Sequence, residues 1–162
     1  MGKNVLMMMA CAVLAAGCAS NMTPSEAGSP EAARKVLIAG ETSAFKSKVV
    51  AQVIENLGTR DWYFRMIGLD RLAEQETSRY GAILLVASQR AGRMDNRVSS
   101  YLSNNPSDPK VIIFLTRGSE PAGERVKPVM GVDAVSSASR DDGVERRAKE
   151  LAALIEKRFS TP

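Results

Sequence analysis

The sequence predicts an α/β domain with a doubly wound, five-stranded parallel sheet and helices on both faces. Three short, continuous apolar runs, at 35–40, 82–88 and 110–116, are typical of strands that are buried on both faces of a parallel sheet. Segments with helical periodicity separate these runs, and this alternation of strand and helix indicates such a sheet. The range 35–160 is long enough for one domain and too short for two.

Two further strands are expected at 62–69 and 132–137. The first alternates between apolar and polar residues, which predicts an edge or near-edge position, and the second has a weaker pattern. The first helix has apolar residues four positions apart from Phe45 to Leu57, and Gly58 is its expected stop. The last helix is expected to begin near Asp141 or Asp142 as N-cap. Its predicted buried face holds Val144, Ala148, Leu151, Ile155 and Phe159.

Residues 1–17 have the composition of a signal peptide, with a basic start, an apolar stretch at 5–14 and small residues before Cys18. The apolar stretch is too short for a membrane-spanning helix. The ending Leu-Ala-Ala-Gly-Cys resembles the lipobox of bacterial lipoproteins. That resemblance implies cleavage before Cys18, a diacylglyceryl group on its sulfur and a fatty acid such as palmitate on its new amine. The alternative is a secreted protein whose apolar stretch happens to end in Gly-Cys.

Lipidation would hold the mature protein on a membrane of the bacterial cell envelope, because two or more acyl chains make a stable anchor. Ala19, and not an aspartate, follows Cys18. By resemblance to sorted lipoproteins, this favours the outer membrane, with the protein facing the periplasm. Residues 18–34 are rich in Ala, Ser, Pro, Gly and Glu, so we expect the lipidated cysteine and a disordered tether there. The range 35–160 is then the folded domain.

The composition excludes several kinds of catalytic site. The chain has no histidine, and of its two cysteines Cys11 belongs to the leader and Cys18 to the anchor. Ser-His-Asp and Cys-His nucleophiles, zinc sites with ordinary ligands and haem held by His or Cys are therefore excluded. Carboxylate metal sites, Ser or Lys chemistry, and a cofactor held by backbone and hydroxyl groups stay open. No catalytic residue or metal ligand is predicted.

The charge balance gives no sign of a nucleic-acid partner. The full chain has 22 basic and 18 acidic residues, and removal of Lys3 with the leader leaves 21 against 18. No basic cluster is interleaved with aromatic residues, as nucleic-acid-binding surfaces commonly are.

Two long segments resemble the flavodoxin-like family. The stretch YGAILLVASQRAGRMDNRVSSYLSNNPSDPKVIIFLTRG (80–118) is similar to the middle of such a domain, and KVLIAGETSAFKSKVVAQVIENL (35–57) to its beginning. Tyr80, Gly92, Arg93 and Met94 match the family pattern. The resemblance implies a flavodoxin-like fold and FMN as cofactor, bound outside the carboxyl ends of the strands where the strand order reverses.

The first loop departs from the family's phosphate-binding pattern, which resembles Ser-x-Thr-Gly-x-Thr. Its hydroxyl positions fall on Glu41, Ser43 and Lys46, and its glycine falls on Ala44. Glu41 would repel a phosphate, and Ala44 restricts the backbone. Lys46 could still pair with a phosphate at the helix N-terminus, where hydroxyls can donate as well. The favoured alternative is that Thr42 or Ser43 caps the helix and that Lys46 is solvated.

The second loop departs at the position of the ring-stacking aromatic. The family pattern there resembles Gly-Ser-Pro-x-aromatic-x-Gly, and this chain has Arg90 at the aromatic position and Val86 at the first glycine. An arginine plane can stack on a ring, but a surface arginine is the favoured interpretation. The polar loop at 116–128 corresponds to the region that closes over the flavin in the family.

These observations leave two main hypotheses. In the first, a lipid-anchored flavodoxin-like domain has degenerate or lost FMN binding and acts as a binding or structural module for an unidentified envelope protein. In the second, it binds FMN and transfers electrons or acts as an oxidoreductase at the membrane surface. A third option is another small anion bound by Lys46, Arg90 and Arg93. The candidate cofactor-binding residues, for FMN or another phosphate or anion, are Thr42, Ser43, Ala44, Lys46, Ser47, Ser88, Arg90, Gly92, Arg93, Arg117 and Gly118.

Overall fold

The structure is a computed structural model that describes residues 20–90, 93–118, 131–138 and 143–160. The predicted leader with Cys18, the expected N-cap at Asp141 or Asp142, and Gly92 lie outside this part of the chain. Within the described ranges, no helix combines the length and apolar character needed to cross a membrane.

Five parallel strands form the centre of the sheet, in the order β4-β3-β5-β7-β8. The chain runs from β3 out to β4 and then returns past β3 to β5, so the strand order reverses beside β3. This confirms the predicted doubly wound sheet, and its order places the ligand-binding crevice of such folds at the carboxyl ends of β3 and β5. The bounds are β3 Arg34–Thr42, β4 Trp62–Gly68, β5 Ala82–Arg90, β7 Val111–Arg117 and β8 Asp133–Ala138.

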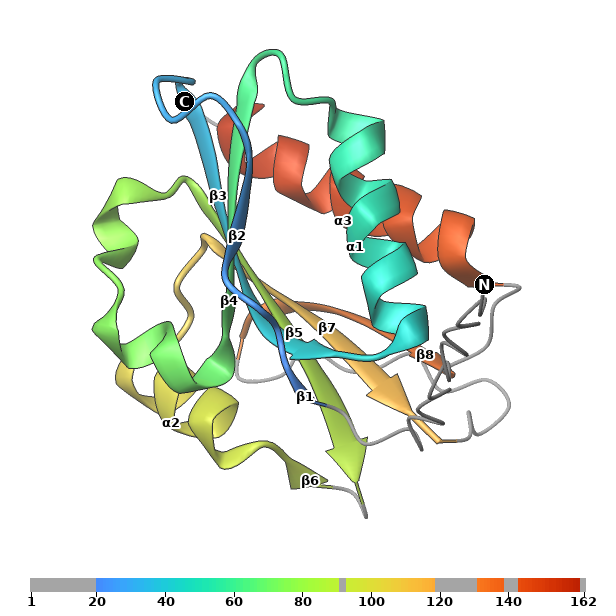
Figure 1. The fold of residues 1–162 in the computed structure, drawn as a ribbon. Coiled ribbons are helices and arrows are strands. Elements are labelled where there is room, and N and C mark those ends of the chain that lie inside the picture. Colours follow the sequence, from blue (N-terminus) through green and yellow to red (C-terminus); the bar gives the residue numbers. More distant parts are fainter. Residues whose placement is uncertain (1–19, 91–92, 119–130, 139–142, 161–162) are drawn as a thin grey trace, which may run out of the picture.

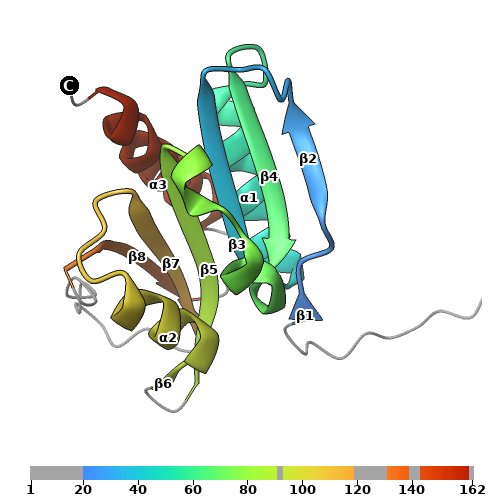
Figure 2. The ribbon, with the colours of Figure 1, turned by 90° about the vertical axis from the view of Figure 1, so that its left-hand side faces the viewer.

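Helices cover both faces of the sheet, as predicted. The helices α1 (Ala44–Leu57) and α3 (Val144–Ser160) pack side by side on one face (Figure 1). The other face is covered by α2 (Asn96–Asn104) and by two 3-10 helices, η1 (Leu69–Glu74) and η2 (Thr77–Arg79), which connect β4 to β5 (Figure 2).

The core has two halves, one on each side of the sheet, because successive strand residues point to opposite faces. In β3, Val36 and Ile38 face α1 and α3, whereas Leu37 and Ala39 face α2 and η1. All four are fully buried. The apolar runs of the sequence therefore form strands buried on both faces, as expected for a parallel sheet.

The two predicted helices form with their expected buried faces. Val49 and Val53 of α1 are fully buried, and Gly58 ends the helix with φ of 75°, a value that glycine adopts without strain. In α3, Leu151 and Ile155 are buried in the core. Phe159 extends that face by packing edge-on against Trp62, with ring centroids 5.0 Å apart.

The expectation of a disordered tether is wrong for residues 20–28. They form β1 (Ser20–Asn21), which pairs antiparallel with the end of β3, and β2 (Ser25–Gly28), which pairs antiparallel with β4. β2 is the edge strand, so β4 has the near-edge position that its alternating pattern predicted. Pairing with β2 satisfies the backbone groups that β4 would otherwise expose along its edge.

Few side chains hold this N-terminal segment, which explains why its composition resembled a tether. Met22 is 9% exposed within the core, Ala27 packs against the core, and Glu26 forms an ion pair with Arg65. Gly28 has φ of +83°, and an added Cβ there would lie 2.0 Å from the carbonyl oxygen of Trp62. Only glycine fits at this close approach of two backbones.

Candidate functional site

The carboxyl ends of β3 and β5 carry a cluster of polar side chains where the strand order reverses. We call it the switch-point cluster. It lies at the edge of the sheet where ligands bind in doubly wound folds. Its charged members are buried, because Lys46 is 1% exposed and Glu41 is 8% exposed. The cluster consists of Glu41, Thr42, Ser43, Lys46, Ser47 and Ser88.

Lys46 reaches inward from the first turn of α1 and joins the ends of the two strands. Its Nζ donates to Oε2 of Glu41 at 3.0 Å and to Oγ of Ser88 at 2.6 Å. The backbone N–H of Ser88 donates to the same Oε2 at 3.0 Å. A carboxylate held by an ammonium group and a backbone N–H has the partners that a bound phosphate would take at such a site.

The pKa values of this buried pair reflect both its burial and its hydrogen bonds. Burial alone would raise the pKa of Glu41, but the hydrogen bonds from Lys46 and Ser88 and the charge of Lys46 hold it below its usual value. Burial lowers the pKa of Lys46 more than the Glu41 carboxylate raises it, and the charge of Arg90 lowers it further. Glu41 is therefore ionised at neutral pH.

The hydroxyl groups of the first loop are engaged within the loop. Thr42 Oγ1 and Ser47 Oγ lie 2.6 Å apart and share a hydrogen bond. Ser43 is the N-cap of α1, and its Oγ accepts from the backbone N–H of Lys46 at 3.3 Å. Ala44 is the first residue of α1. The groups that were expected to surround a phosphate thus bond to one another.

This geometry confirms one part of the favoured interpretation of the loop and corrects another. Ser43 caps the helix, as predicted. Lys46, however, is not solvated: it is one of the most deeply buried side chains of the described chain. The physical reason is Glu41, whose carboxylate offsets the cost of burying the ammonium group.

The loop also has a spacing that the flavodoxin-like alignment did not reveal. Gly40, Lys46 and Ser47 match the first glycine, the lysine and the hydroxyl residue of the phosphate-binding pattern Gly-x-x-x-x-Gly-Lys-Ser/Thr. Phe45 stands in place of the second glycine. Its ring is buried and lies 6.2 Å from that of Phe114, so it anchors α1 in the core where the pattern requires close approach of the backbone to a phosphate.

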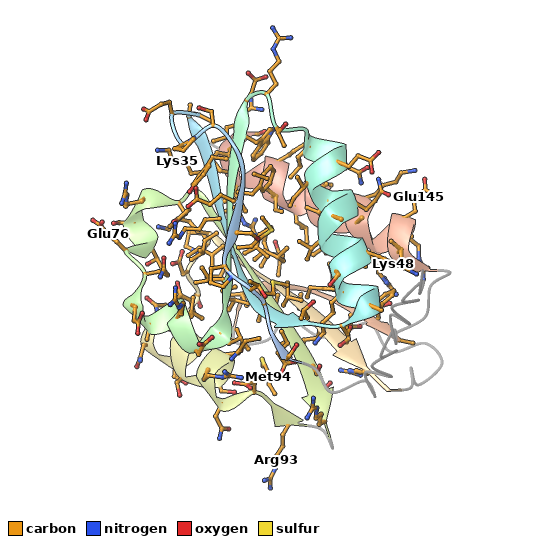
Figure 3. The ribbon with its side chains drawn as sticks, viewed as in Figure 1. Lys35, Lys48, Glu76, Arg93, Met94 and Glu145 are labelled. Atoms are coloured by element: carbon orange, nitrogen blue, oxygen red, sulfur yellow. The ribbon has the colours of Figure 1, made fainter. Side chains whose placement is uncertain are left out.

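Two exposed arginines, Arg90 and Arg93, lie at the end of β5 and the start of β6 (Arg93–Met94). Arg90 ends β5, and β6 turns back along it, so that Arg90 and Arg93 are register partners. Both side chains are exposed, and Arg93 points away from the domain (Figure 3). Lys46 is buried and donates hydrogen bonds to Glu41 and Ser88. The structure therefore does not join Lys46, Arg90 and Arg93 in one anion site.

The remaining candidates lie at the end of β7. Arg117 is half-buried, and its Nε is shielded from solvent without a hydrogen-bond partner among the described residues. Gly118 is exposed. Most of the polar loop at 116–128 lies outside the described residues.

Three further cavities are lined by described residues, and none of them has a buried ion pair like that of the switch point. One of about 510 Å³ lies between η1 and α2 and is lined by Asp70, Arg97 and Tyr101, among others. Another of about 320 Å³ lies between α1 and the N-terminal segment, beside Met22 and Ile54. Among the described residues, no group of three or more acidic side chains could hold a metal ion.

The residues present do not fit the phosphate of FMN. The lysine that could bind it is already paired with Glu41, and the Glu41 carboxylate would repel a dianion at the same position. β1 also pairs with Thr42 and Glu41 along the end of β3. The position of the stacking aromatic is held by the exposed Arg90.

Comparison with known proteins identifies the fold. No family model and no curated protein matches the chain. A solved flavodoxin from the domain Archaea aligns with 77% of this chain and 99% of its own, at 10% identity and a TM-score of 0.54. GDP-bound IFT22 from T. brucei aligns with 78% of this chain and 95% of its own, at 19% identity and a TM-score of 0.54.

A third solved structure, rubredoxin oxygen:oxidoreductase from Desulfovibrio gigas, aligns with 80% of this chain and 38% of its own, at 15% identity and a TM-score of 0.52. At such identities the likeness concerns the fold alone, because unrelated functions share doubly wound folds. The domain has a flavodoxin-like fold.

Proposed function

We propose that this protein is a lipid-anchored module of the bacterial cell envelope that has lost tight FMN binding and acts by binding an envelope protein. The observation that carries the proposal is the buried Glu41–Lys46 pair with Ser88. Its carboxylate takes the partners that a cofactor phosphate would need. The flavodoxin-like fold then serves as a scaffold that presents its surface.

The anchoring part of the proposal rests on the sequence. The ending Leu-Ala-Ala-Gly-Cys and the apolar stretch before it resemble a lipoprotein leader. The structure is compatible with an anchor at this place, because residues 20–28 attach the N-terminal end of the domain firmly to β3 and β4. We place the anchor in the outer membrane, facing the periplasm, because Ala19 and not an aspartate follows Cys18.

The alternative is an FMN-binding electron carrier or oxidoreductase at the membrane surface. The fold supports it, since flavodoxins share the fold. A nucleotide is a further option for the same loop, because Gly40, Lys46 and Ser47 keep the spacing of a phosphate-binding loop and one structural neighbour is GDP-bound. Both options require Lys46 to leave Glu41.

The first experiment is a titration of the purified mature protein with FMN, followed by quenching of flavin fluorescence, and a parallel calorimetric titration with GDP. We expect no saturable binding of either ligand at micromolar concentrations. Saturable micromolar binding of FMN would support the alternative of an FMN-binding electron carrier or oxidoreductase. Binding of GDP would identify a nucleotide site.

A matched variant makes that negative result informative. Glu41→Ser, Ala44→Gly and Lys46→Thr together remove the charge pair and restore the residue types of the family's phosphate loop. We expect this variant to bind FMN more tightly than the wild type, and Arg90→Tyr should add to the gain by restoring a ring for stacking. If the folded variant gains no affinity, Glu41 and Lys46 are not what blocks the site.

The anchor is tested separately with Cys18→Ser. We expect the wild-type protein in the membrane fraction and the variant as a folded protein in the soluble envelope fraction. A variant that stays in the membrane fraction would contradict a lipid anchor at Cys18.

A further inference from the structure

The N-terminal segment enters the fold at the carboxyl edge of the sheet (Figure 2), where β1 pairs with residues of the switch-point cluster. Ser20 pairs with Thr42, and Asn21 pairs with Glu41. The backbone N–H of Met22 donates to the carbonyl of Gly40 at 2.9 Å. The start of the described chain is therefore fixed to one particular edge of the domain.

The predicted lipid attachment site is only a few residues before the strand that is fixed to this edge. Cys18 precedes Ser20 by two residues, and two residues can span about 7 Å at most. Lipidation of Cys18, which belongs to the proposed function, would thus draw the carboxyl edge to the membrane. A disordered tether of the length expected from composition would not have imposed any orientation.

The same edge presents exposed arginines. Arg90 and Arg93 lie on the hairpin after β5, and Arg93 points away from the fold (Figure 3). Arg97 at the start of α2 donates to Asn21 and is paired with Asp95. Lys35, near the start of β3, and Glu76 line one cavity toward the opposite, amino edge of the sheet, and both lie above Arg93 in the view of Figure 3.

We propose that the domain lies on the membrane with its carboxyl edge down and that Arg90 and Arg93 contact the headgroups of anionic phospholipids. Basic side chains near such a surface are attracted to it over about one Debye length, roughly 10 Å at 0.1 M salt. The switch-point cluster then faces the bilayer. The amino edge, with Glu76, faces away and is open to a protein partner.

The orientation is tested with the lipidated full-length protein in vesicles that contain phosphatidylglycerol and a nitroxide-labelled headgroup lipid. A fluorophore is attached to a single introduced cysteine, either Gly118→Cys at the carboxyl edge or Glu76→Cys at the amino edge. A Cβ at Gly118 meets no atom of the described residues within 4 Å, and Glu76 is exposed, so both sites are chosen for the label. Cleavage of the expected leader would remove Cys11 and acylation would occupy Cys18, so that neither would react with the label.

We expect nitroxide quenching at residue 118 to be several-fold stronger than at residue 76. Equal quenching, or stronger quenching at residue 76, would overturn the orientation. Absence of quenching at both positions in a protein that mass spectrometry shows to be lipidated would also overturn it, while leaving the anchor intact. A protein that carries no lipid would overturn both the orientation and the anchoring on which it rests.

The headgroup contact has its own matched pair of variants. Arg90→Glu with Arg93→Glu reverses the charge at the carboxyl edge, and Arg79→Glu reverses an exposed charge in η2 near the amino edge. We expect the first variant to weaken the quenching at residue 118 and the second to leave it unchanged. In vesicles of neutral lipids, the quenching at residue 118 of the wild type should weaken in the same way. Unchanged quenching in the double variant would refute contact between these arginines and the headgroups.

Discussion

The turns after β3 and after β5 lie at the same edge of the sheet but are built in opposite ways. The first turn keeps its charges inside, where Glu41, Lys46 and Ser88 bond to one another. The second turn holds its charges outside, on Arg90 and Arg93. Charges in the first turn therefore affect the stability of the domain, whereas charges in the second are available to other molecules.

Removal of the buried ammonium group in the first turn should lower the free energy of unfolding more than any other change considered. Lys46→Met leaves the Glu41 carboxylate buried without its cation, and breaking such a pair costs about 3–5 kcal/mol. Arg90→Ala, the control in the second turn, should change the free energy of unfolding by less than about 0.5 kcal/mol. Urea denaturation measures both values, and equal losses would contradict the contrast between the turns.

A double-mutant cycle should show that Glu41 and Lys46 act as a unit. Glu41→Leu with Lys46→Met replaces the pair by apolar side chains, which is often neutral or stabilising relative to the intact pair, whereas removal of one partner alone is strongly destabilising. We expect the double variant to be more stable than Lys46→Met alone, with a coupling of about 2 kcal/mol. Strictly additive losses in urea denaturation would mean that the two side chains do not depend on each other.

The N-terminal segment should contribute to stability although it resembles a tether. Met22→Ala removes a side chain that is 9% exposed and packed in the core, so we expect a loss of about 2 kcal/mol. Thr23→Ala at the neighbouring exposed position is the control, with a change below about 0.5 kcal/mol. Thermal unfolding that does not distinguish the two variants would show that β1 and β2 are not part of the cooperative fold.

Acid should weaken the first turn through Glu41. Its pKa is lower in the folded protein than in the unfolded chain, so the unfolded state binds the proton more readily. The stabilisation is complete above the usual glutamate pKa and is lost as the pH falls through the lowered value. Urea denaturation between pH 7 and acidic pH should show a smaller decline for Glu41→Gln than for the wild type, and identical slopes would rule out this contribution.

The sequence was sufficient to predict the five parallel strands and the helices α1 and α3, because their patterns are local. The apolar runs around Ile38, Leu84 and Ile113 and the four-residue spacing from Phe45 to Leu57 specify buried strands and an amphipathic helix without any tertiary information. The predicted sheet and the last helix follow from the same kind of signal.

The N-terminal strands and the buried pair of the site could not be predicted from the sequence, because tertiary contacts determine them. β2 is held mainly by backbone pairing with β4. Such pairing cannot be predicted from side-chain composition. Lys46 meets Ser88 across 42 positions of sequence, and only the folded sheet places them together. The spacing of Gly40, Lys46 and Ser47 was the local signal that could have drawn attention to Lys46 as a buried functional position.

The central claim is that Glu41 holds Lys46 where a cofactor phosphate would bind. Nuclear magnetic resonance of the Lys46 ammonium group, recorded while inorganic phosphate, FMN or GDP is added, tests it most directly. We expect a slowly exchanging, hydrogen-bonded ammonium signal that none of the three ligands shifts. A saturable shift of that signal, together with one of the Ser88 amide, would show that a phosphate displaces Glu41 and would contradict the claim.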